Sequence, residues 1–266
     1  FRKFFKNIML LPRIIPCLLM TNEGLVKTIN FDNPNYIGDP INAVKIFNEK
    51  KADELILLDI DASVKKYEPN FNLISNVARE SRMPICYGGG IKYLDQAKKI
   101  FNFGIEKIAI SSIIHHDLKI ISKISNYAGS QSTVIVLDIK KKNNEYKFFV
   151  ENGKKEIDKD LLSSIKIFES EGAGEIVINS IDQDGLMKGY DFDLIDQIYE
   201  ITNIPVTILG GAGSLKDIEN AIERYGNIGF ACGSLFIYKG PRKAVLINYP
   251  DLIDKKKLLS GYFDEE

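Results

Sequence analysis

Short runs of apolar residues recur eight times along the chain, and a segment of helical periodicity follows each one. The runs are rich in Ile, Val and Leu with little polar alternation, which is typical of parallel strands buried on both faces. They cover residues 13–19, 54–59, 84–88, 106–111, 132–138, 174–180, 205–209 and 227–232. Asp39 before Pro40 indicates a helix start, and Gly104 after Phe103 indicates a helix stop. Eight strand–helix alternations predict an α/β fold, a closed (β/α)8 TIM barrel.

The two halves of the chain repeat each other at an offset of about 121 residues. The matching pairs are Pro84 with Pro205, Gly89-Gly90 with Gly210-Gly211, and Ile60-Asp61 with Ile181-Asp182. Internal similarity over four strand–helix units predicts a two-fold half-barrel repeat. Neither a linker nor a shift in composition separates the halves, so residues 1–266 are predicted to form a single domain.

The composition narrows the choice of class and partner. A length of 266 residues fits one barrel, and a net charge of −1 gives no reason to expect nucleic acid or an anionic membrane as partner. Cys17, Cys86 and Cys232 lie inside apolar runs without metal-ligand spacing. We therefore expect reduced core cysteines, no metal, no cofactor and a cytoplasmic protein. The basic, apolar stretch 1–11 is interpreted as an N-terminal extension, since it lacks the cleavage site of a signal peptide.

Two glycine-rich turns lie at equivalent places in the halves, where strands are expected to end. Glycine lets backbone N–H groups approach an anion closely, and barrels bind phosphate at the loops that follow their strands. Each turn also has serine hydroxyls on the neighbouring strand. Two phosphate cradles are therefore predicted, one from Gly89, Gly90, Ser111 and Ser112 and one from Gly210, Gly211, Gly233 and Ser234. Tight turns without a ligand are the alternative.

Acidic residues follow several of the predicted strands. Asp138 comes after an apolar run with no turn signal, so we interpret it as a general acid–base. Asp59 is a further strand-end acid, whereas Asp61 and Asp182 are equally well explained as turn or helix-cap residues. His115 and His116 lie at a predicted helix start and are expected on the surface, without a role.

Charged residues of both signs occupy the opposite ends of four strands: Arg13, Glu54, Lys107 and Glu175. On spacing alone a solvated cluster of ion pairs explains them as well as a functional site does.

The segments RIIPCL, DELILLDIDAS, GGGI, GAGEI, SIDQDG and GGAG together resemble the cyclase subunit of imidazole glycerol phosphate synthase over about residues 12–235. This resemblance implies a barrel that takes ammonia from a glutaminase partner at its N-terminal face to a phosphorylated substrate at the other end. It implies an ammonia gate at Arg13, Glu54, Lys107 and Glu175. By position, Asp138 matches a catalytic aspartate, Lys27 the lysine of a flexible first loop, and Asp184 and Gly185 join the second phosphate site.

One departure from the resemblance matters most. The second catalytic aspartate of that family should follow Cys17-Leu18, where this chain has Leu19, which cannot transfer a proton. The C-terminal stretch 239–266 also diverges. Both features resemble paralogous barrels associated with surface-polysaccharide loci and sugar amidation, in which ammonia is provided to a separate amidotransferase.

Four hypotheses about function therefore remain open. The leading one is an ammonia-channelling subunit for amidation of a surface-polysaccharide sugar. The others are the histidine-pathway cyclase itself, a non-catalytic scaffold that activates a glutaminase, and an isomerase acting on a bisphosphorylated nucleotide, against which Leu19 argues. The apolar stretch within 239–250 is expected to be exposed and to contact the amidotransferase.

Overall fold

The computed structural model describes residues 11–22 and 24–262, and it is a closed barrel of eight parallel strands. The barrel strands are β1 (Arg13–Thr21), β4 (Leu55–Asp59), β5 (Ile85–Gly88), β6 (Lys107–Ile110), β7 (Thr133–Lys142), β10 (Glu175–Ser180), β11 (Val206–Leu209) and β12 (Gly229–Cys232). Each pairs with the next in parallel, and β12 closes onto β1. The predicted (β/α)8 fold is confirmed, and every predicted run overlaps one barrel strand, although β1 and β7 extend beyond their runs.

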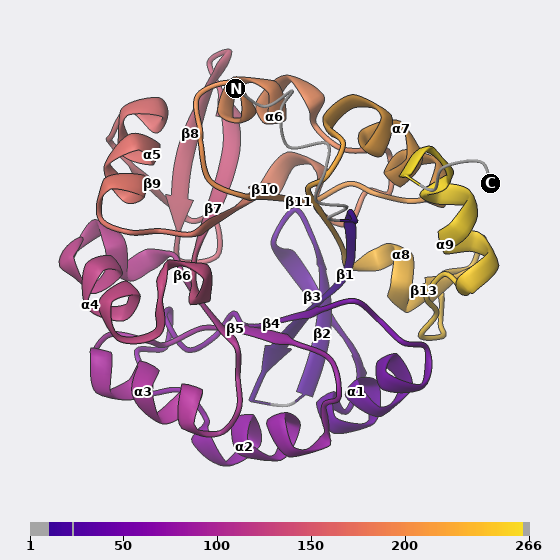
Figure 1. Cartoon of the computed structure of the whole chain (residues 1–266), viewed down its shortest axis with the longest axis horizontal. Helices are drawn as coiled ribbons and strands as arrows, with labels where there is room; N and C mark the ends of the chain where they lie inside the picture. The colour runs from indigo at the N-terminus through magenta and orange to yellow at the C-terminus, as the bar shows by residue number, and fades with distance from the viewer. Residues whose placement is uncertain (1–10, 23, 263–266) are drawn as a thin grey trace.

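Helices surround the strands in the order of the chain (Figure 1). They are α1 (Pro40–Glu49), α2 (Phe71–Glu80), α3 (Leu94–Asn102), α4 (Lys119–Ala128), α5 (Leu161–Ser170), α6 (Phe192–Tyr199), α7 (Leu215–Tyr225) and α8 (Ser234–Ile237). Short 3-10 turns cover Ser112–His115, Ser130–Ser132, Ile181–Gln183 and Ser260–Tyr262. As the sequence predicted, Asp39 caps α1 by accepting a hydrogen bond from the Asn42 backbone N–H at 2.8 Å.

Antiparallel hairpins follow the first strand of each half, and the sequence analysis did not predict them. After β1 come β2 (Gly24–Ile29) and β3 (Asp32–Gly38); after β7 come β8 (Glu145–Val150) and β9 (Lys155–Ile157). Asn30-Phe31 and Asn143-Asn144 form the two-residue turns with positive φ, as type I′ hairpins require. The two turns differ in place, but the strand pair β2–β3 after β1 corresponds to the pair β8–β9 after β7, in agreement with the half-barrel repeat.

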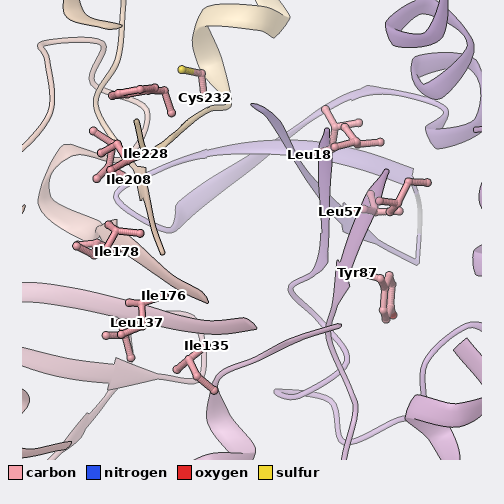
Figure 2. Close-up of a cluster of buried hydrophobic side chains, with 14 of the residues drawn as sticks. Leu18, Leu57, Tyr87, Ile135, Leu137, Ile176, Ile178, Ile208, Ile228 and Cys232 are labelled. Atoms are coloured by element: carbon pink, nitrogen blue, oxygen red, sulfur yellow. The ribbon is translucent and has the colours of Figure 1, made fainter. Parts of the chain in front are cut away.

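The strands have two buried faces, as their uninterrupted apolar runs predicted. Outward-pointing side chains such as Leu57, Tyr87, Ile135 and Ile178 belong to the cluster between barrel and helices (Figure 2). The inward-pointing side chains form a separate, smaller cluster inside the barrel. Its members are Ile15, Cys17, Ile56, Cys86, Ala109, Val134, Val136, Val177, Leu209 and Ala231. The three cysteines are buried and free, as expected.

The C-terminal segment replaces an ordinary eighth helix. After α8 the chain forms a small hairpin, β13 (Tyr238–Lys239) with β14 (Ala244–Val245), and ends in α9 (Leu252–Leu258) against α7. The expectation that its apolar stretch is exposed is wrong in part. Val245 and Leu246 are exposed, but Tyr249 is buried, donates its hydroxyl to the Ile14 carbonyl at 2.8 Å and accepts the Asp53 N–H at 3.2 Å.

Residues 11–22 and 24–262 form no helix that is long and apolar enough to cross a bilayer. Most of the N-terminal extension, residues 1–10, and residues 263–266 of the C-terminal segment lie outside the described residues.

Candidate active site and channel

Four charged side chains close the N-terminal end of the barrel in an alternating ring, which we call the gate: Arg13, Glu54, Lys107 and Glu175. Glu54 contacts Arg13 at 2.5 Å and Lys107 at 2.8 Å, and Glu175 contacts both cations at 2.8 Å. The predicted residues thus meet, although they are far apart in sequence. Both carboxylates are buried, so this is not a solvated cluster.

Burial and pairing act in opposite directions on the gate. Burial by itself would lower the pKa of Arg13 and of Lys107, but the neighbouring glutamates outweigh it and raise both pKa values. Burial would raise the pKa of Glu175, but Arg13 and Lys107 hold it below its usual range. All three groups therefore keep their charge.

Thr207 is a gate neighbour that the sequence analysis missed. Its fully buried hydroxyl donates to Glu175 at 2.5 Å and accepts from Arg13 at 3.3 Å. Gly229 makes the room for this hydroxyl, since a Cβ there would lie 2.0 Å from it. A threonine in an apolar strand carries no sequence signal of such a contact.

The C-terminal end of the barrel holds a cavity of about 410 Å³. It is lined by all ten residues predicted to bind phosphate, which confirms their common location but does not test the binding. The small and apolar side chains of the inner cluster fill the barrel interior, and five of them, Cys17, Ala109, Val136, Leu209 and Ala231, also line the cavity. Charged side chains thus lie at one end of the barrel and apolar side chains in its interior, and at the other end lies a cavity whose wall includes both apolar and polar groups.

Close backbone approaches require the glycines of both turns. Gly89 has φ +123°, and a Cβ there would lie 2.5 Å from the Asp59 carbonyl. Gly211 has φ +110°, and a Cβ there would lie 2.0 Å from the Gly189 carbonyl. Any side chain would displace the neighbouring backbone, so both positions require glycine.

We call the turns after β5 and β6, with Gly89, Gly90, Ser111 and Ser112, the first cradle. The turns after β11 and β12, with Gly210, Gly211, Gly233 and Ser234, are the second cradle. Ser234 is 5% exposed, and its Oγ has no hydrogen-bond partner among the described residues. A buried hydroxyl left without a partner at a cavity wall fits a site that a polar ligand group completes.

Asp138 points into the cavity from β7. The prediction that Asp138 ends its strand is wrong, because β7 continues to Lys142 as part of the hairpin. Burial raises the pKa of Asp138 to about 7; the Asn179 amide, which donates to it at 2.7 Å, opposes this rise, and the Asp184 charge adds to it. A carboxyl group that titrates near neutrality can both accept and donate a proton.

Leu19 lies on the same inward-facing row of β1 as Ile15 and Cys17 and lines the same cavity as Asp138. The position where the resemblance expects a second carboxylate is therefore part of the cavity wall. In this chain the Leu19 side chain exposes only carbon atoms to the cavity.

Lys27 differs from the flexible-loop lysine that the resemblance implied. It lies in β2, is 4% exposed, and its Nζ is 2.7 Å from Asp184. Asp184 also accepts from the Thr28 hydroxyl at 2.7 Å and the Phe31 N–H at 3.3 Å. The Asp184 side chain is thus occupied in holding the β2–β3 hairpin, and Gly185 beside it lines the cavity.

Asp59 and His115 both make contacts that stabilise nearby parts of the fold. Asp59 accepts from the N–H groups of Asp61 and Ala62 and from the Tyr67 hydroxyl, each at 3.0 Å, and so fixes the loop after β4. The expectation of a surface residue is wrong for His115. It packs on Phe148 with ring centroids 5.7 Å apart, and burial lowers its pKa to about 4.

The sequence analysis also missed several polar residues of the cavity. Ser63, Lys66, Lys92 and the exposed His116 line it around the first cradle. These residues lie in irregular loops, where no periodicity marks a direction. In the described ranges the acids, histidines and cysteines form no cluster that could hold a metal ion.

Comparison with known proteins agrees with this geometry. A family model described as "Histidine biosynthesis protein" matches residues 13–241, which include every barrel strand. The chain belongs to this family. A family member from Leptospira borgpetersenii, named "Putative imidazole glycerol phosphate synthase subunit HisF", is 55% identical over 94% of this chain and 99% of its own length.

Other relatives extend the family comparison. A Vibrio vulnificus protein with a corresponding "Putative" name is 49% identical over 94% of this chain and 97% of its own length. A Natranaerobius thermophilus protein named "Imidazole glycerol phosphate synthase subunit HisF" is 34% identical over 91% of this chain and 96% of its own length.

Proposed function

We propose that this chain is the barrel subunit of a glutamine-dependent complex. It would take ammonia from a glutaminase partner at the gate and pass it through the barrel interior to the cavity. The observation that carries the proposal is the combination of a closed ring of charged side chains, an apolar barrel interior, and a cavity at the opposite end whose wall includes polar strand-end residues. The acceptor would be a phosphorylated small molecule, and amidation of a surface-polysaccharide sugar by a separate amidotransferase is the proposed use of the ammonia.

The cavity wall supports this use over ring closure. Asp138 supplies one group that titrates near neutrality, but Leu19 supplies none. Loss of one general acid–base typically costs a reaction a factor of about 10² or more. Delivery of ammonia requires the gate and interior, both of which this chain has, and does not require Leu19 to react.

Cyclisation is the second candidate, and the names of the relatives favour it. A cyclase assay with the bisphosphorylated aminoimidazole-carboxamide nucleotide and excess ammonium salt bypasses any glutaminase. We expect turnover at least about 100-fold below that of an ordinary synthase subunit. Turnover within tenfold of such a subunit would favour the histidine-pathway function, as would complementation of a strain that lacks this cyclase.

A scaffold that only activates a glutaminase is the third candidate, and the gate separates it from a channel. Lys107 contacts both gate glutamates, so Lys107→Ala should change the transfer of glutamine-derived ammonia while glutaminase activation persists. Unchanged transfer, in a variant that thermal unfolding shows to be folded, would favour the scaffold.

A further inference from the structure

Two pairs of neighbouring residues occupy equivalent places in the two halves of the barrel, and they differ in chemistry. In the first half, Leu19 on β1 lies beside Leu58 on β4 in the parallel ladder. In the second half, Asp138 on β7 lies beside Asn179 on β10 in the same way. All four line the cavity. At this level the β1–β4 side of the cavity is therefore apolar, and the β7–β10 side carries hydrogen-bonding groups.

The Asn179 side chain is 5% exposed, and only part of its hydrogen-bonding capacity is used. Its Nδ2 donates to Asp138 at 2.7 Å, whereas its Oδ1 has no hydrogen-bond partner among the described residues. A Cβ at Gly210 would lie 3.4 Å from this oxygen, so glycine leaves the space beside it open. A buried carbonyl oxygen without a donor costs free energy, which a ligand that donates a hydrogen bond would recover.

The Asp138 carboxylate has no cationic partner in the described parts of the chain. Within these parts its side chain accepts from the Asn179 amide and forms no ion pair. Asp184 adds negative charge near it, and Lys27 is already paired with Asp184 at 2.7 Å. A buried carboxylate needs either a proton or a cation. The site therefore favours a ligand that brings positive charge and N–H donors.

Asp138 and Asn179 lie where the apolar interior ends. Val136 and Val177 precede them on the same inward-facing rows of β7 and β10, and both valines belong to the inner cluster. Under the proposed function, ammonia that passes along this interior meets Asp138 and Asn179 directly after this apolar layer.

We propose that Asp138 and Asn179 form a binding site for ammonium at this end of the barrel interior. The Asp138 carboxylate and the Asn179 Oδ1 each accept an N–H, and the remaining N–H bonds face the cavity. Ammonia that meets the acid form of Asp138 takes its proton: an O–H bond breaks, an N–H bond forms, and ammonium and a carboxylate result. The proton returns to the carboxylate when ammonia leaves to react. This inference deepens the proposed function and rests on it for the source of ammonia.

The raised pKa of Asp138 supports this role. At about 7, both the acid, which can protonate ammonia, and the carboxylate, which can hold ammonium, are populated near neutrality. Bound ammonium should in turn lower this pKa, because a nearby positive charge favours the carboxylate. A metal ion fits less well, since the acids, histidines and cysteines of the described ranges form no cluster that could hold one.

A titration of the full chain with isotope-labelled ammonium chloride at pH 8 and constant ionic strength, followed by nitrogen NMR, tests the proposal. We expect saturable binding. Asn179→Leu removes the Oδ1 acceptor at nearly equal size and should weaken binding by at least about tenfold, which corresponds to about 1.4 kcal/mol. Asp138→Asn removes the charge and should weaken it further. Ser63→Ala, at another polar residue of the cavity lining, is the control and should leave the affinity unchanged.

A second measurement follows the carboxyl carbon of Asp138 by NMR as the pH is varied. Ammonium should lower the pKa of Asp138 in the unaltered chain, and sodium at the same ionic strength should not. A purely structural role of Asn179 would not produce this difference between the two cations.

Three results would overturn the proposal: no saturable binding of ammonium to the unaltered chain, equal affinity in Asn179→Leu, or equal competition from sodium. Thermal unfolding of each variant identifies misfolding. The titration involves neither a glutaminase nor the gate, so its failure leaves the channel proposal standing. Conversely, unchanged ammonia transfer in Lys107→Ala does not affect the ammonium titration.

Discussion

Single side chains decide the chemistry at each end of the barrel. At the C-terminal end, Asp138 remains a carboxylic acid to near neutrality because it is buried, and the hydrogen bond from the Asn179 amide opposes this rise in pKa only in part. At the gate, Thr207 joins the anion Glu175 to the cation Arg13 through one hydroxyl. Both side chains lie on strands whose residue pattern predicts only apolar core. The raised pKa of Asp138 and the two hydrogen bonds of Thr207 therefore come from neighbouring residues and not from their own segments.

Asp138→Asn should stabilise the protein, and more so as the pH rises. Because its folded pKa of about 7 exceeds the unfolded value, the native state binds the extra proton between about pH 4 and 7, and stability falls as pH rises through this window. Asparagine keeps an acceptor for Asn179 but does not ionise. Denaturant unfolding should show little difference at pH 4 and a gain on the order of 4 kcal/mol at pH 8. A gain that is the same at both pH values would contradict a raised pKa.

Thr207→Val should destabilise the gate without changing side-chain shape. It removes a donor from buried Glu175 and an acceptor from Arg13, which should lower the free energy of unfolding by about 1–3 kcal/mol. Thr207→Ser is the control, because it keeps the hydroxyl and should recover most of the loss. If valine and serine variants are equally stable in urea, the hydroxyl has no such role.

At the scale of elements, the loop after β10 holds the hairpins of both halves. Asp184 binds the β2–β3 hairpin through Lys27, Thr28 and Phe31, and Asp182 accepts the Lys141 N–H of the other hairpin at 2.7 Å. Neighbouring carboxylates thus fix segments that are remote in sequence.

Asp184→Ala should release one hairpin selectively. It leaves the Lys27 ammonium buried without its ion pair, so amide hydrogen exchange in residues 24–38 should accelerate by at least about tenfold. Asp182→Ala is the matched control and should affect residues 140–150 instead. Equal exchange of 24–38 in both variants would show that Asp184 does not hold this hairpin.

The sequence could predict the barrel elements but not these hairpins. Barrel strands are buried on both faces, so their apolar runs mark them within four residues at either end. In contrast, the β3 segment DNPNYIG is mostly exposed, and β7 continues into Lys140, Lys141 and Lys142, where no apolar pattern remains. The Lys27–Asp184 pair joins residues far apart in the chain, which only a resemblance or a structure could bring together. The gate was predictable because its members begin, or directly precede, aligned strands.

At the scale of the whole molecule, the C-terminal segment completes the ring of secondary structure around the barrel. Tyr249 attaches this segment to the first strand through Ile14 and to the start of β4 through Asp53, and its ring packs on Phe47 and Phe236. Exposed Val245 and Leu246 lie in the same segment but on the surface. Truncation of residues 239–250 would remove both features together and could not distinguish a docking surface from a structural one.

Point substitutions separate the two roles. Tyr249→Phe removes the hydroxyl between the Ile14 carbonyl and the Asp53 N–H and should lower the free energy of unfolding by about 1–3 kcal/mol. Val245→Ser/Leu246→Ser replaces two side chains that are about half exposed and should alter stability by about 0.5 kcal/mol or less. Urea unfolding of both variants measures this contrast. If Val245→Ser/Leu246→Ser proved more destabilising than Tyr249→Phe, the Val245 and Leu246 side chains would stabilise the fold by packing. The proposed amidotransferase would then have no free apolar surface in this segment to contact.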